Sequence, residues 1–85
     1  MRPKDTGAQN KARKAYEEAV LRAFRAYRKT KEQADMAHEK ALKQAIDKKA
    51  REKADKKYKE TLERARKVRD EAMDEAQKVF SDAQK

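Results

Sequence analysis

Cysteine and tryptophan are absent from this 85-residue chain, and glycine, proline and histidine occur once each. Without cysteine, the protein has no disulfide bond, no thiolate metal site and no thiol redox chemistry. With one glycine and one proline, it also has few of the residues that favour tight turns. The sequence therefore predicts long elements of secondary structure joined by very few turns.

Residues that carry catalysis are equally scarce. His38 is the only histidine and Ser81 the only serine, and no motif for a nucleophile, a phosphate-binding loop or a metalloprotease is present. Asp35 and His38 have the spacing of the Glu-x-x-His pairs in di-metal helical bundles, but with Asp in place of Glu. We expect no enzymatic activity, no metal site and no cofactor. His38 is interpreted as a histidine packed in a helical bundle, with pH sensing as the alternative.

Long apolar runs are missing too. None approaches the roughly 20 residues that a membrane-spanning helix needs. The first six residues lack the apolar core of a signal peptide. We therefore expect a cytoplasmic protein without a transmembrane span.

Charged residues make up 48% of the chain and hydrophobic ones 36%, a composition dominated by Ala, Lys, Glu and Arg that is typical of long helices and coiled coils. The length fits one small domain with little material for a core. Intrinsic disorder is the competing interpretation, because charge is high and aromatic residues are few. A sustained helical period counts against it.

That period is an alanine stripe in the first half of the chain. Its members recur in steps of four, three and four residues, an 11-residue repeat of about 3.67 residues per turn that follows one face of a nearly straight helix. The stripe consists of Ala8, Ala12, Ala15, Ala19, Ala23, Ala26, Thr30, Ala34, Ala37, Ala41 and Ala45. It predicts one continuous helix over residues 8–46, preceded by a flexible tail at 1–7, where Thr6 and Gln9 have the spacing of a capping box.

A second stripe has a different phase. From Leu42 the apolar positions advance in fours, and by Leu62 the stripe has moved more than about 100° around the helix at 100° per residue. It then keeps this phase to Ala83. The change predicts a turn near 47–49, a second helix over 50–83 and an antiparallel helical hairpin within a single domain at 8–85. Residue i would lie opposite residue 98 − i, pairing Phe24 with Met73, Val20 with Val79 and Tyr16 with Phe80.

Two other architectures stay open at this stage. Thr30 follows two basic residues and precedes Gln33 in a second capping-box pattern, which favours a three-helix bundle with turns near 29–31 and 55–59. A single unbroken helix is the other, because residues 47–49 include no Gly, Pro, Asn or Ser.

The apolar arc of the first helix is wider than one neighbouring helix covers, since large side chains lie beside the alanine stripe. A hairpin of this size is expected to be marginal alone, so we predict a homodimer that forms a four-helix bundle. The predicted interface consists of Tyr16, Val20, Phe24, Tyr27, Met73, Val79 and Phe80.

Charge is the feature with functional content. The net charge is +9, with +6 on residues 1–46, +4 on 47–59 and −1 on 60–85. Arginine and lysine clusters of this kind suit phosphate groups, although a solvated helix face is the commoner explanation of a charge run. The candidate nucleic-acid-binding residues are Lys14, Arg22, Arg25, Arg28 and Lys29 on the first helix, and Lys48, Lys49, Arg51, Lys53, Lys56 and Lys57 at the turn.

The sequence therefore favours a small basic helical protein that binds DNA or RNA through phosphate contacts with little sequence specificity. The main alternative is a structural adaptor that docks onto a helical protein partner. Attachment to an anionic membrane surface is a third hypothesis, but an alanine-rich face buries little area in lipid.

Overall fold

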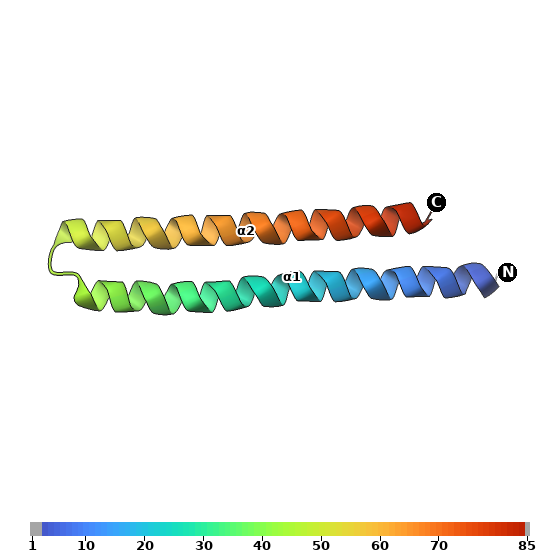
Figure 1. Ribbon diagram of the computed structural model, residues 1–85, viewed down its shortest axis with the longest axis horizontal. Coiled ribbons are helices and arrows are strands. Elements are labelled where there is room, and N and C mark those ends of the chain that lie inside the picture. Colours follow the sequence, from blue (N-terminus) through green and yellow to red (C-terminus); the bar gives the residue numbers. More distant parts are fainter. Residues whose placement is uncertain (1–2, 85) are drawn as a thin grey trace.

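The computed structural model describes residues 3–84 and consists there of two helices, α1 (Pro3–Gln44) and α2 (Lys48–Gln84). The helices lie side by side and antiparallel, with both ends of the chain at the same end of the molecule (Figure 1). The molecule is a rod with extents of 68 × 16 × 11 Å. This confirms the all-α hairpin. The three-helix and single-helix alternatives are wrong, because α1 runs unbroken through Thr30, α2 runs through 55–59, and the chain reverses between them.

The first helix begins earlier than expected, at Pro3 instead of Ala8. Proline fits the first turn of a helix, because the N–H that it lacks has no helical acceptor there. Thr6 and Gln9 consequently lie inside α1, so the capping box at the start of the helix is wrong. Of the predicted tail, residues 1 and 2 lie outside the described residues.

The turn is formed by residues 45–47, two residues before the expected position. The backbone N–H of Ala45 donates to the carbonyl of Leu42 at 3.3 Å, which closes the last turn of α1. Asp47 then caps α2: its Oδ1 accepts the backbone N–H of Ala50 at 2.8 Å. Ile46, which lies four residues after Leu42 and so continues the spacing of the second stripe, is instead 96% exposed at the tip of the hairpin.

The earlier turn shifts the pairing of the two helices. Tyr16 packs against Phe80 with ring centroids 5.3 Å apart, as expected. However, the expected register, in which the numbers of two opposite residues add up to 98, is not observed. The sum is 93 for Asp35 with Tyr58 and 96 for Tyr16 with Phe80. By these sums Phe24 lies opposite residues 69–72 and Val20 opposite 73–76, so the expected partner Met73 is displaced by one to four residues and Val79 by three to six.

The interior of the hairpin is thin. The buried hydrophobic residues of the described chain are Ala23, Ala34, Leu62 and Ala76, so only Leu62 contributes a large side chain. Several other large apolar side chains are exposed: Leu21, Phe24, Met36, Leu42, Ile46, Val68 and Val79. One helix against one helix covers a single strip of each, and the hairpin lacks the two-sided core of a compact domain.

Candidate nucleic-acid interface and terminal groove

The basic residues of α1 form an outward face. Because α1 directs Ala23 and Ala34 toward α2, the helical period of 3.6 residues places Lys14, Arg25 and Lys29 on the opposite side. Both Arg22 and Arg28, which flank this row, are exposed as well. None of the five is in an ion pair among the residues that the structure describes. Their charges are available to a ligand.

The second basic cluster lies at the tip of the hairpin, in the first three turns of α2. Lys48, Lys49 and Arg51 occupy its first turn, which includes no acidic residue. The helix dipole places partial positive charge at this end, so these side chains add to a potential of the same sign. Within the described chain, Lys48 alone of the six candidate residues here has an acidic partner, Glu52, at 4.0 Å. The remaining three candidates, Lys53, Lys56 and Lys57, are exposed one to two turns further along α2.

The hairpin does not bring the two basic regions together. The α1 face points away from α2, while Lys49, Lys53 and Lys56 share the side of α2 that points away from α1. The two regions therefore lie on opposite edges of the rod. Lys40 and Lys43, in the last two turns of α1, also lie close to the tip, and the sequence analysis did not single them out. Lys43 is paired with Glu39 at 3.4 Å.

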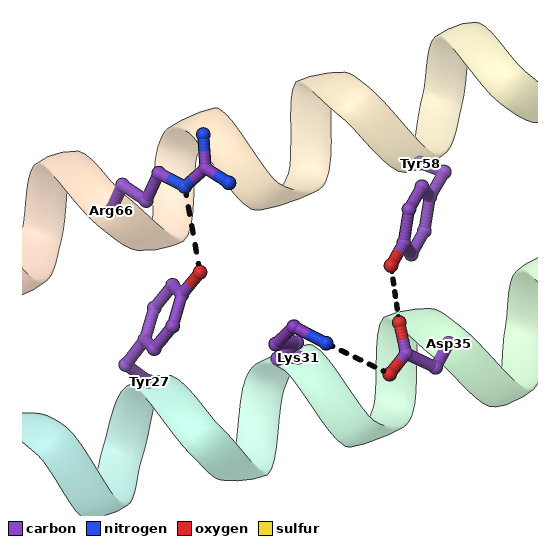
Figure 2. A network of polar contacts seen from close by, with 5 residues as sticks. All are labelled: Tyr27, Lys31, Asp35, Tyr58 and Arg66. Atoms are coloured by element: carbon purple, nitrogen blue, oxygen red, sulfur yellow. Dashed lines mark hydrogen bonds and ion pairs between the residues drawn. The ribbon is translucent and has the colours of Figure 1, made fainter.

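Polar contacts join the helices in the half of the rod nearer the tip. The hydroxyl of Tyr58 on α2 donates to Oδ1 of Asp35 on α1, and Nζ of Lys31 lies 3.3 Å from the other carboxylate oxygen (Figure 2). Closer to the middle of the rod, Nε of Arg66 donates to the Tyr27 hydroxyl at 3.5 Å. We call Lys31, Asp35, His38, Asp55 and Tyr58 the polar cluster.

The geometry of the polar cluster shifts the pKa values of its members. The hydrogen bond from Tyr58, with a smaller contribution from Lys31, holds the pKa of Asp35 below its ordinary value of 3.8. The same bond raises the pKa of Tyr58 above 10.0, because losing the phenol proton would leave an anion facing a carboxylate. Its bond to Asp35 likewise raises the pKa of Lys31 above 10.5.

His38 is a packing residue of this cluster. Its ring stacks on Tyr58 with centroids 4.5 Å apart, and Nε2 lies 2.7 Å from Oδ1 of Asp55. This confirms a half-exposed histidine between the helices. Of the described residues, no group of three or more His, Cys, Asp or Glu is arranged to hold a metal ion.

The other half of the rod, toward the chain ends, carries an apolar groove of about 840 Å³ between the helices. We call it the terminal groove. It runs along residues 12–30 of α1 and 61–83 of α2, and nine of its twenty lining residues are alanine. Larger residues line it as well: Tyr16, Tyr27, Val68, Val79 and Phe80, with Arg22, Arg64, Arg69 and Glu75 among the charged ones.

The predicted dimer interface divides between two parts of the surface. Four of its residues line the terminal groove, namely Tyr16, Tyr27, Val79 and Phe80. Three do not, namely Val20, Phe24 and Met73. Arg69, which the sequence did not single out, lies over the ring of Tyr27 at 4.6 Å from its centroid and forms part of the groove floor.

No protein-family model, curated protein or solved structure matches this chain. Neither helix, over the residues described, includes a stretch long and apolar enough to cross a membrane. The functional interpretation consequently rests on the charge and geometry above.

Proposed function

We propose that this is a non-enzymatic cytoplasmic protein that binds DNA or RNA through its phosphate groups and works as a homodimer of hairpins. The observation that carries the proposal is the pair of unneutralised basic regions, the α1 face and the tip cluster. Their side chains are exposed, and within the described chain only Lys48 of the eleven candidates has an acidic partner. Polyanions would relieve the repulsion within each region.

Base readout plays little part in this proposal. The aromatic rings Tyr16 and Phe80 pack on each other, and Tyr27 is covered by Arg69, so these rings are engaged within the hairpin. Because Phe24 is the one aromatic residue classed as exposed, and because no reading helix of defined sequence pattern is present, binding is dominated by phosphate contacts. The expected signature is a steep dependence of affinity on salt concentration.

The test measures binding to a DNA duplex and to a folded RNA over a range of salt concentrations. Each phosphate contact contributes roughly 0.9 to the slope of log K against log salt for duplex DNA. Removing two contacts, by Arg25→Gln with Lys29→Gln or by Lys53→Gln with Lys56→Gln, should reduce that slope by roughly 1.8. Affinity at about 50 mM salt should fall at least tenfold.

Lys67→Gln with Lys78→Gln is the matched control. It removes the same charge from exposed positions of α2 outside both candidate regions. If the control lowers the slope as much as the two test variants, binding reflects net charge alone and the assigned residues are wrong. If the unaltered protein does not bind at about 50 mM salt, the nucleic-acid function is wrong.

An adaptor function is the second candidate, and the terminal groove is the observation that favours it. An open apolar groove can receive a helix of another protein, as in helix-in-groove recognition. In that case a stable protein partner should co-purify with the chain and resist nuclease treatment.

A further inference from the structure

The hairpin exposes far more surface than its mass requires. Its accessible surface is 7534 Å², whereas a compact monomer of 9.9 kDa is expected to expose about 5200 Å². The excess of about 2300 Å² exceeds the roughly 800 Å² that each partner buries in a standard interface and lies within the range of obligate dimers. The surface available for a second copy is therefore sufficient.

The terminal groove is the face of the described chain that best fits such an interface. Val68 and Val79 line the groove, although they are 64% and 59% exposed. The surrounding alanines leave room for close approach of another helix. The groove runs for about 27 Å along α1, or five turns, at 1.5 Å per residue. Burying apolar side chains over this length would supply the second half of a core that the hairpin lacks.

The charged residues of the groove help to select the arrangement of two copies: the α2 wall carries Arg64 and Arg69 as well as its one acidic residue, Glu75. Arg22 lies on the α1 wall and Glu75 on the α2 wall, and the structure records no ion pair between them within the chain. A two-fold axis parallel to the helices places α1 of one copy on α2 of the other, so that Arg22 meets the Glu75 of the second copy. A perpendicular axis would instead set the two copies of Arg22 beside each other, which is repulsive.

We infer that the terminal groove is the contact surface between two copies of this chain, related by a two-fold axis parallel to the helices. Each helix then has two antiparallel neighbours, one from its own chain and one from the other, as in an antiparallel four-helix bundle. The inference deepens the proposed self-association and rests on it, because it specifies the face and the symmetry of the dimer.

This symmetry also unites the basic regions that one hairpin separates. The outward face of α1 and the outward face of the second copy's α2 lie on the same side of the bundle. Arg22 is then paired with Glu75 of the second copy, and the other α1 candidates of one copy lie on the same side of the bundle as the tip cluster of the other, nearer the chain ends. The same arrangement is repeated on the opposite side. The nucleic-acid surface proposed above is complete only in the dimer.

Cysteine cross-linking tests the arrangement, because the native chain has no cysteine. Ala26 and Val68 both line the groove and lie at matching heights in the observed register. Two single variants, Ala26→Cys and Val68→Cys, are mixed, refolded together and oxidised. We expect a mixed disulfide from the mixture and none from either variant alone. Met36→Cys mixed with Lys67→Cys, both exposed outside the groove, is the control for random collisions.

Each result has a defined consequence. A disulfide between two copies of Ala26→Cys, or between two copies of Val68→Cys, would show that a different arrangement forms the contact and would overturn this one. A dimer in sedimentation without a mixed disulfide would leave self-association intact but show that another face forms the contact. A monomer would overturn both. Failure to bind nucleic acid, with the mixed disulfide present, would reject only the nucleic-acid function.

A charge swap provides a second test that leaves the groove lining apolar. Arg22→Glu should raise the dissociation constant of the dimer at least tenfold, because two like-charged pairs replace two attractive ones. Adding Glu75→Arg to the same chain should restore dimerisation. Circular dichroism at high protein concentration checks that each variant is helical. If Arg22→Glu does not change the dissociation constant, or if adding Glu75→Arg does not restore dimerisation, the arrangement is wrong.

Discussion

Tyr58 on α2 donates a hydrogen bond through its hydroxyl to Oδ1 of Asp35 on α1, and its ring stacks on His38 of the same helix as Asp35. One side chain of α2 therefore contacts two positions of α1 that are three residues apart, on one face of the helix. The pair fixes the height of α2 against α1 in the half of the rod that lacks the groove.

Removing the hydroxyl of Tyr58 should destabilise the hairpin less than removing the ring. Tyr58→Phe deletes the hydrogen bond to Asp35 and keeps the stack on His38, whereas Tyr58→Leu deletes both. We expect the Tm to fall in the order unaltered protein, Tyr58→Phe, Tyr58→Leu, by thermal circular dichroism at one protein concentration. Equal Tm values for the unaltered protein and Tyr58→Phe would show that the bond does not stabilise the hairpin.

The hydrogen bond to Asp35 should also respond to acid. The pKa of Asp35 is lowered in the folded protein. The contribution of the Asp35 carboxylate to stability is therefore complete above pH 3.8 and disappears as the pH falls through the folded pKa. The Tm difference between the unaltered protein and Tyr58→Phe should be constant between about pH 5 and 8 and shrink toward about pH 2. A difference that grows in acid would have the wrong sign.

The opposite end of the pH scale offers a related measurement. The pKa values of Tyr58 and Lys31 are raised in the folded protein. Their contributions to stability are therefore complete below pH 10.0 for Tyr58 and below pH 10.5 for Lys31, and are lost as the pH rises through the folded pKa values. Spectrophotometric titration of the tyrosines should show one group of higher pKa in the unaltered protein. That group should be missing in Tyr58→Phe and move to lower pH in Asp35→Asn.

The cap at the start of α2 predicts a local effect. Asp47→Ala removes the oxygen that accepts the backbone N–H of Ala50 and should lower the free energy of unfolding by about 1 kcal/mol. For a chain of this size that corresponds to a Tm lower by about 4–8 °C. Asp47→Asn keeps a capping oxygen and should be nearly neutral. A large loss in Asp47→Asn would assign the effect to charge and not to capping.

Leu62 predicts the largest effect of a single truncation. It is 9% exposed and is the one large side chain of the thin interior, so Leu62→Ala should lower the free energy of unfolding by about 2 kcal/mol or more. Leu21→Ala is the matched control, because Leu21 is 50% exposed and its truncation should change stability by less than about 0.5 kcal/mol. Denaturant unfolding at a fixed protein concentration compares them, and similar losses would contradict the assigned interior.

The position of the turn is a feature that the sequence could have predicted. Asp47 is among the residues that cap helices, and it precedes a basic stretch with good helix formers. Treating Asp47 as a cap instead of a turn residue would have placed the turn at 45–47 and corrected the register. Ile46 obscured this, because its apolar side chain continues the spacing of the second stripe although it is exposed at the tip.

The sequence by itself determined the helices and the reversal between them, because the spacing of alanine and large apolar residues is a local property of each helix. The tertiary structure decided the register and the separation of the two basic regions. It also decided which large residues line the groove, so that Val79 and Phe80 lie in it while Phe24 and Met73 do not. These features depend on where the turn ends and on contacts such as that of Tyr58 with Asp35, which no periodicity within one helix encodes.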